Sequence, residues 1–162
     1  MRSTILLKSL ATRMGVMLII MSHPLRSVAR KPTGLSFVEA SAIPLAGGTA
    51  WEAVVRRLAV RPGETILIHG GAGGVGSFAV QFAAGARVLA SASADNQYFL
   101  RQLGADMTID YRKDDAAEIT LRGTYGYGAD AAFDIEGIDI VARCLPAGPT
   151  VRSGRLCLAA AR

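Results

Sequence analysis

The sequence predicts an α/β fold built on a doubly wound parallel sheet of five strands, and three observations carry this prediction. Residues 64–70, ETILIHG, form an apolar run that is too short for a helix and ends in a cluster of glycines. The next segment, SFAVQFAAG, places apolar residues at helical spacing, and ARVLAS follows as a second strand. Strand, glycine turn, helix and strand within about 30 residues make a βαβ unit. Downstream, strand patterns alternate with helix patterns, which is typical of a parallel sheet covered on both faces.

The glycine turn of this unit is a candidate phosphate-binding loop. Gly71, Gly73 and Gly76 stand in the G-x-G-x-x-G spacing. One glycine makes the tight turn, the next lets the backbone approach a pyrophosphate, and the third lets the helix pack on the strand. The amides and the dipole of the helix N-terminus then attract the phosphates. An ordinary turn can show the same spacing, but the βαβ context favours a Rossmann-type dinucleotide-binding domain.

The end of the second strand favours NADP over NAD as the cofactor. An NAD-binding unit places an acidic residue about 20 residues after the first glycine, where it accepts hydrogen bonds from the ribose. Here that position is Ser91, followed by Ala92 and Ser93. These residues contain no carboxylate to repel a 2′-phosphate, and the two hydroxyls can donate to it. Alternatively, the serines only cap the next helix, a role that Asp95 can also fill.

The other elements are predicted from caps, periodicity and turn residues. Ser36 and Glu39 form a capping box that opens a helix, and Pro44 interrupts it. A second helix over 48–58 contains Trp51, which we expect in the core. The remaining predictions, in chain order, are a turn at 61–63, a helix from Ser93 or Asp95 to Leu103 that ends at Gly104, a strand over 105–111, a helix over 115–121, a strand over 130–135, a short helix over 139–145 and a strand over 155–160.

Composition indicates one globular domain and argues against nucleic acid as a partner. The chain has 162 residues, of which 51% are hydrophobic and 19% charged, which excludes a disordered chain. The net charge of +5 arises from residues 1–31, which contain six basic residues and no acid, so the rest carries 12 basic against 13 acidic residues, or −1. Cys144 and Cys157 lack CxxC or Cys/His clustering, so we expect reduced core cysteines and no metal site.

Residues 1–21 form a basic leader of unknown status, and residues 22–162 the predicted binding domain. The apolar run over 14–21 is too short to span a bilayer, so we expect no membrane partner. It fits the apolar region of a signal peptide, part of a mitochondrial presequence, or the undefined start of a truncated chain, and no A-x-A cleavage site follows it. We predict a cytoplasmic protein, with mitochondria as the alternative.

Five segments of the chain occur in an order that matches a known family: KPTGLSFVEASAIPLAGGTAW, ETILIHGGAGGVGSFAVQFA, GARVLASAS, LGADMTIDYR and FDIEG. Together they resemble the nucleotide-binding half of the medium-chain dehydrogenases/reductases, in the quinone oxidoreductase and zeta-crystallin-like branch. The resemblance implies an NADPH-dependent oxidoreductase, alcohol dehydrogenase-like, that reduces small-molecule quinones, enones or related carbonyls. It also implies that the family's catalytic domain and sixth strand are missing, so we expect a truncated chain and name no catalytic residue. The fifth strand then forms an edge through which copies of the chain can pair.

The resemblance assigns cofactor-binding roles to ten residues. The phosphate loop comprises Gly71, Ala72, Gly73, Gly74, Val75 and Gly76. Thr49 matches a threonine near the nicotinamide, and Ser91, Ser93 and Tyr111 match the 2′-phosphate region. A family lysine in the helix after the second strand is Asn96 here, and Arg112 and Lys113 either compensate for the lost charge or form a solvated basic pair.

Two alternatives to a working oxidoreductase remain open from the sequence. One is a non-catalytic NADPH-binding module, and the other is an inactive truncated product. His69, at the end of the first strand, has no carboxylate or thiol partner that the sequence can name, so we expect it to be structural rather than catalytic.

Overall fold

The computed structural model describes residues 4–5, 21–22, 29–135, 144 and 155–158. The chain divides into two compact units, Met1–Ser41 and Ala42–Arg162. The predicted boundary between residues 21 and 22 stays a prediction.

The first unit contains a short antiparallel pair and one helix turn. Strands β1 (Thr4–Ile5) and β2 (Met21–Ser22) pair with each other, and α1 covers Phe37–Ser41. The predicted capping box is present: the Ser36 amide donates to Glu39 Oε2 at 2.7 Å, and the Glu39 amide donates to Ser36 Oγ at 3.2 Å. Hydrogen bonds from Ser36, through its hydroxyl and then its backbone amide, lower the pKa of Glu39.

The second unit is a parallel sheet in the order β5-β4-β3-β6-β7. The strands are β3 (Thr65–His69), β4 (Arg87–Ala92), β5 (Met107–Asp110), β6 (Ala131–Asp134) and β7 (Arg155–Leu158). Strands β3 to β6 are described with their side chains, and β7 is described as backbone beside β6. The chain runs outward from the central β3 to one edge and then returns to its other side, which is the Rossmann order. The predicted α/β class with a doubly wound parallel sheet is confirmed.

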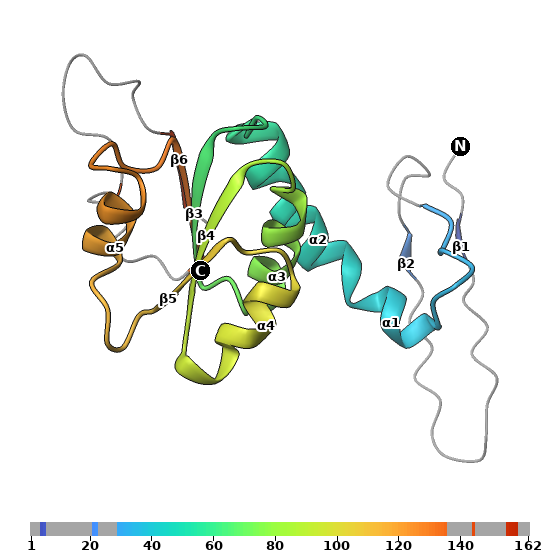
Figure 1. Cartoon of the computed structure of the whole chain (residues 1–162). Helices are drawn as coiled ribbons and strands as arrows, with labels where there is room; N and C mark the ends of the chain where they lie inside the picture. The colour runs from blue at the N-terminus through green and yellow to red at the C-terminus, as the bar shows by residue number, and fades with distance from the viewer. Residues whose placement is uncertain (1–3, 6–20, 23–28, 136–143, 145–154, 159–162) are drawn as a thin grey trace. The chain divides into compact units, whose positions relative to one another are not determined.

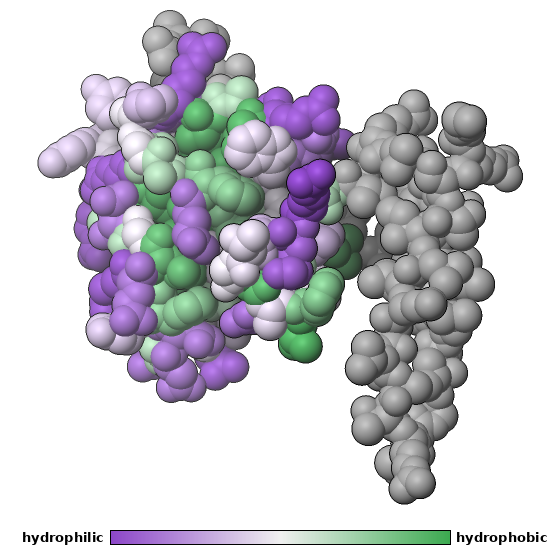
Figure 2. All heavy atoms as spheres, turned by 90° about the vertical axis from the view of Figure 1, so that its right-hand side faces the viewer, coloured by the Kyte–Doolittle hydropathy of each residue, from purple (hydrophilic) through white to green (hydrophobic). Residues whose placement is uncertain are grey.

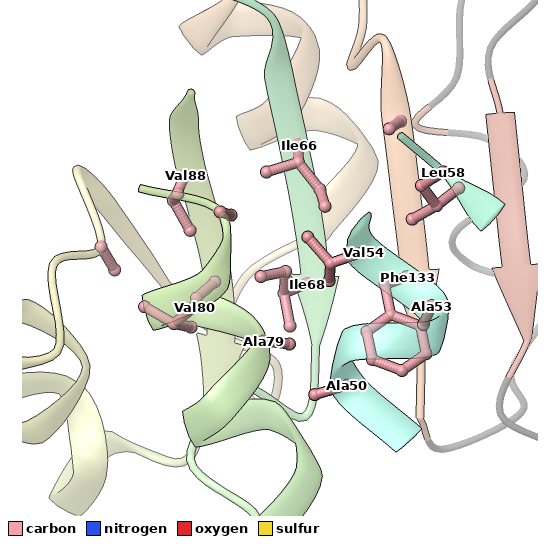
Figure 3. Close-up of a cluster of buried hydrophobic side chains, with 14 of the residues drawn as sticks. Ala50, Ala53, Val54, Leu58, Ile66, Ile68, Ala79, Val80, Val88 and Phe133 are labelled. Atoms are coloured by element: carbon pink, nitrogen blue, oxygen red, sulfur yellow. The ribbon is translucent and has the colours of Figure 1, made fainter. Parts of the chain in front are cut away.

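Helices cover both faces of this sheet. They are α2 (Ile43–Trp51), the π-helical turn η2 (Glu52–Arg57), α3 (Gly74–Phe82), the 3₁₀ turn η3 (Ala94–Asn96), α4 (Gln97–Gln102) and α5 (Ala116–Gly123). Figure 1 shows α2, α3 and α4 on one side of the strands and α5 on the other. Two buried clusters result, because successive residues of a strand point to opposite faces. Ile66 and Ile68 join the cluster with α2, η2 and α3 (Figure 3), whereas Leu67 packs in the second cluster with Ala117 of α5.

Two expectations about the segment before β3 are wrong. Helix α2 begins at Ile43 rather than at Gly48, because Pro44 occupies its first turn, where the missing amide hydrogen costs no hydrogen bond. Trp51 is 50% exposed and packs edge-to-face on Phe82 with a centroid separation of 5.5 Å, so it is not a core residue. The helix predicted over 139–145 falls on residues outside the described part, apart from Cys144, which is buried in the second cluster.

Apolar side chains on the surface are interspersed with polar ones. On the face drawn in Figure 2, hydrophilic residues separate the smaller hydrophobic areas of the second unit. Within the residues that the structure describes, no helix is both long enough and apolar enough to cross a membrane. The two clusters of buried hydrophobic residues lie between the helices and the sheet.

The cap of α5 leads to a stability prediction. The Asp115 carboxylate accepts hydrogen bonds from the amides of Ala117 at 2.9 Å and Glu118 at 3.4 Å. We expect Asp115→Ala to lower the free energy of unfolding by about 1 kcal/mol, measured by urea denaturation. Asp115→Asn keeps an equivalent cap and should remain within about 0.5 kcal/mol of the parent. Equal losses in the two variants would contradict the capping explanation.

Candidate dinucleotide-binding site

The loop between β3 and α3 lies at the carboxyl edge of the sheet and is folded on itself. Gly70 has a φ of +76°, a left-handed conformation that side chains other than glycine rarely adopt. The Gly73 amide donates to the Gly70 carbonyl at 3.1 Å, which closes the turn. The Ser77 amide then donates to the Gly73 carbonyl at 2.9 Å, the first hydrogen bond of α3. Gly73 is thus the N-cap residue of this helix.

Two of the motif glycines are required by close packing. A Cβ atom on Gly76 would lie 2.2 Å from the Gly70 carbonyl oxygen and 2.7 Å from the Gly71 Cα, so any side chain there collides with backbone. A Cβ atom on Gly71 would lie 3.0 Å from the Ala90 Cβ and 3.1 Å from Leu100 Cδ2. The absence of a side chain at these two positions lets the start of α3 approach the loop backbone and lets the loop approach Ala90 of β4, which is the steric role predicted for the spacing.

The other face of the loop is open to a ligand. Gly73 and Gly74 are exposed, and the nearest atoms to a Cβ built on them lie 3.4 Å and 4.0 Å away. Helix geometry leaves the amides of Gly74, Val75 and Gly76 without intrahelical acceptors, and Gly73 provides no side-chain cap. The positive end of the α3 dipole adds to the attraction for an anion. The loop therefore has the shape and the donors that a pyrophosphate requires.

Ser91 lies at the predicted position in β4, and its hydroxyl is buried and hydrogen-bonded within the protein. The residue is fully buried, with an exposure of 0%. Its Oγ lies 2.6 Å from His69 Nδ1 and accepts a hydrogen bond from the Gly70 amide at 3.3 Å. Its carbonyl accepts a hydrogen bond from the Gly71 amide at 2.9 Å. Through these hydrogen bonds Ser91 joins β4 to His69 and to the first two residues of the loop. A contact between its hydroxyl and a 2′-phosphate stays a prediction.

Ser93 and Tyr111 lie at the same edge, beyond the ends of β4 and β5. Ala92 and Asp110 are register partners, so the residues that follow them leave neighbouring strands together. Ser93 is partly buried, and its Oγ accepts a hydrogen bond from Asn96 Nδ2 at 3.1 Å. Tyr111 is 47% exposed. The structure thus brings both residues to the side of the sheet that carries the glycine loop.

Arg112 adds a positive charge at this edge. Its guanidinium carbon lies 5.6 Å from the centre of the Tyr111 ring, a cation–π arrangement. The nearby Asp110 carboxylate is largely buried, and it accepts a hydrogen bond from the Arg112 amide at 3.1 Å and approaches Lys113 Nζ at 4.0 Å. The Asp110 carboxylate is thus engaged by the Arg112 amide and by Lys113, while the Arg112 guanidinium lies over the Tyr111 ring.

Thr49 lies on α2, which packs beside α3. Its Oγ1 donates to the Leu45 carbonyl at 2.8 Å within the same helix. The two helices approach closely, since a Cβ atom on Gly47 would lie 3.8 Å from the ring of Phe78. Thr49 is therefore a neighbour of the phosphate-loop helix, and its contact with the nicotinamide stays a prediction.

The role of His69 was missed from the sequence. His69 is 3% exposed, is hydrogen-bonded to Ser91, and is also the register partner of Asp134, a buried aspartate at the end of β6. The rings of His69 and Tyr111 make an edge-to-face contact, with centroids 6.3 Å apart. The available signal was that His69 and Ser91 each stand at the end of a predicted neighbouring strand. Among the residues with described positions, no group of three or more His, Cys, Asp or Glu could hold a metal ion.

The sheet order and the glycine loop at the start of α3 together define a Rossmann-type dinucleotide-binding domain. The chain belongs to the zinc-binding dehydrogenase family, whose model matches residues 74–159. A zinc-type alcohol dehydrogenase-like protein of Schizosaccharomyces pombe is 38% identical over 112 residues, which cover 67% of this chain and 32% of that protein. The chain therefore spans about a third of the length of this curated relative.

Solved structures of related oxidoreductases share the fold. A quinone oxidoreductase of Pseudomonas syringae has a TM-score of 0.72 and 32% identity, over 78% of this chain and 41% of its own. An NAD-dependent alcohol dehydrogenase has a TM-score of 0.76 and 37% identity, over 86% and 40%. A mycobacterial protein complexed with NADPH has a TM-score of 0.71 and 30% identity, over 80% and 40%. The resemblance to medium-chain dehydrogenases/reductases of the quinone oxidoreductase branch is confirmed, and the chain is an oxidoreductase-family protein.

Proposed function

We propose that this chain binds NADPH as the cofactor-binding part of an oxidoreductase that reduces quinones, enones or related small-molecule carbonyl compounds. The observation that carries the proposal is the loop at the start of α3. Its outer face is open, and three helix amides there have no intrahelical acceptors. On its inner side, Gly76 packs closely on the backbone of Gly70 and Gly71. A bound NADPH supplies the hydride, so the residues of this chain bind and orient the cofactor.

Each part of the site has a separate binding role in this proposal. The amides of Gly74, Val75 and Gly76 hold the pyrophosphate at the positive end of α3. Thr49 borders the nicotinamide side. At the opposite end, the Tyr111 ring and the hydroxyl of Ser93 receive the adenosine ribose and its 2′-phosphate.

The preference for NADPH rests on Arg112 and on the missing acid. The end of β4 carries no carboxylate where an NAD-binding unit needs one to bind the ribose hydroxyls. Arg112 supplies a guanidinium beside Tyr111, and a guanidinium binds phosphate oxygens through two parallel hydrogen bonds. Arg112 therefore replaces the positive charge of the family lysine, whose position is occupied by Asn96 in this chain. One of the structural relatives is an NAD-dependent alcohol dehydrogenase. The preference for NADPH over NADH is therefore the first part of the proposal to test.

A titration of the purified chain with NADPH and with NADH tests this proposal. We expect NADPH to bind at least about tenfold more tightly than NADH, because a charge-assisted hydrogen bond contributes about 1.5–3 kcal/mol. Gly73→Val should abolish binding of both, since its side chain enters the open face of the loop. Undetectable NADPH binding at millimolar concentration would overturn the cofactor assignment.

The second candidate, a non-catalytic NADPH-binding module, is separated by turnover. Quinone-dependent oxidation of NADPH that is lost in Gly73→Val supports the oxidoreductase. Binding of NADPH with no turnover supports the non-catalytic binding module. The absence of a cooperative thermal unfolding transition supports the inactive truncated product. A cytoplasmic or mitochondrial location, and pairing of copies through the sheet edge, stay predictions.

A further inference from the structure

His69 and Ser91 form a buried polar pair directly behind the phosphate loop. The residues are 22 positions apart in the chain, and their side chains are joined by the 2.6 Å contact between Nδ1 and Oγ. Ser91 also accepts hydrogen bonds from two consecutive loop amides, that of Gly70 through Oγ and that of Gly71 through its carbonyl. The first two residues of the loop are thus held by one serine.

We assign the donors of this pair so that the buried serine hydrogen has an acceptor. The Gly70 amide donates to Ser91 Oγ, so the serine can use its one hydrogen to donate to His69 Nδ1. In this assignment Nδ1 is the unprotonated ring nitrogen and Nε2 carries the hydrogen. The imidazole then has a fixed orientation, because turning the ring over would leave the buried hydroxyl hydrogen without this acceptor.

The fixed ring of His69 lies against Tyr111. The two ring planes are 73° apart with centroids separated by 6.3 Å, which is an edge-to-face contact. Tyr111 in turn lies beneath the Arg112 guanidinium. A continuous series of contacts therefore runs from the Gly70 amide through Ser91 and His69 to Tyr111 and Arg112.

We propose that His69 is a positioning residue for cofactor selectivity: it sets the place of Tyr111 at the 2′-phosphate end, while Ser91 sets the loop at the pyrophosphate end. His69 touches neither part of the cofactor. The inference rests on the proposed function, because it assumes that the loop and Tyr111 bind the two phosphate groups of NADPH. It goes beyond that function in assigning selectivity to a buried histidine.

His69→Asn tests the selectivity directly. Asparagine can place an amide oxygen near the position of Nδ1 and keep the hydrogen bond to Ser91, but it removes the aromatic ring that contacts Tyr111. We expect the Kd for NADPH to rise about three- to tenfold, the range that an aromatic contact supplies, with the Kd for NADH within about twofold of the parent. A rise by the same factor for both dinucleotides, or for neither, would overturn the proposal.

Ser91→Ala tests the other half of the pair. The Gly70 amide then loses its acceptor, so the Kd values for NADPH and NADH should rise by the same factor. Ser91→Thr restores a hydroxyl and should return both values toward those of the parent. If Ser91→Ala changed NADPH binding alone, or if neither Kd moved, the division of roles between Ser91 and His69 would be wrong.

A matched control separates positioning from stability. Ile68→Val removes a buried methylene from the opposite face of β3, so it should lower the Tm and leave both Kd values unchanged. A double-mutant cycle adds a second check: in the Tyr111→Ala background, His69→Asn should cause no further loss of NADPH affinity. Additive losses would show that His69 does not act through Tyr111.

Nuclear magnetic resonance of the unmodified chain keeps the inference testable if His69→Asn does not fold. The imidazole resonances of His69 should shift on addition of NADPH and shift less with NADH at saturation. Equal shifts would overturn the proposal. If the unmodified chain bound neither dinucleotide, the proposed function itself would fail, a result that the His69 and Ser91 variants cannot produce.

Discussion

Gly76→Ala is expected to abolish dinucleotide binding and to lower the free energy of unfolding by about 3 kcal/mol. The added Cβ atom would lie 2.2 Å from the Gly70 carbonyl oxygen and 2.8 Å from the Gly71 carbonyl carbon. Both are backbone atoms, so no side chain can rotate away to relieve the collision. The loop or α3 must move, and either movement removes the helix amides from the phosphate position. Urea denaturation and an NADPH titration measure the two effects.

Gly74→Ala is the matched control for this substitution, two residues earlier in the same helix turn. The nearest atom to its added Cβ, the Ala46 Cβ, lies at 4.0 Å, an ordinary contact distance. Since alanine also has a higher helix propensity than glycine, stability should stay equal or rise by up to about 1 kcal/mol. A Gly76→Ala variant as stable as Gly74→Ala would show that the packing behind the loop is not what requires glycine.

Arg112→Glu is expected to weaken NADPH binding by about 100-fold and to leave NADH binding within about twofold. The substitution removes the guanidinium beside Tyr111 and puts a carboxylate near the place proposed for the 2′-phosphate. Arg112→Ala should show the smaller loss of about tenfold, because it removes the attraction without adding repulsion. The difference between parent and variant should shrink as ionic strength rises. Isothermal titration calorimetry at two salt concentrations measures these values.

Arg61→Glu is the control for net charge. It changes the charge of the chain by the same amount, but Arg61 is an exposed residue in the turn before β3, at the amino end of that strand. Binding of NADPH should therefore be unaffected. If Arg61→Glu weakened NADPH binding as much as Arg112→Glu, the effect would be one of overall charge, and the specific role of Arg112 would be rejected.

Much of the fold was predictable because local signals agree with the tertiary structure. The apolar runs that form β3 and β4 need burial on both faces, and Gly104, with a φ of +105°, ends the helical segment after β4 as expected. The errors occurred where an isolated residue was interpreted alone. The first helix does end before Pro44 as expected, but the second helix was started at Gly48 although Pro44 lies in its first turn, and Trp51 was placed in the core although its ring packs at the surface.

The candidate site was predictable in position but not in the direction of its side chains. Counting from Gly71 correctly led to the end of β4, where Ser91 lies. The count cannot tell which face of the strand a residue occupies, and Ser91 faces inward toward His69. From the sequence, Arg112 and Lys113 could either compensate for the lost lysine charge or form a solvated basic pair, because the position of Arg112 over Tyr111 depends on how the chain turns after β5.

The sequence by itself determined the α/β class, the glycine loop and the edge of the sheet at which the site lies. These features follow from short-range physics: strand periodicity, the steric freedom of glycine and the polarity of a helix N-terminus. Only the tertiary structure decided that Ser91 is hydrogen-bonded to the loop and to His69 and that the His69 ring contacts Tyr111. Those contacts unite residues from β3, β4 and the end of β5, and their geometry depends on strand pairing that no local pattern records.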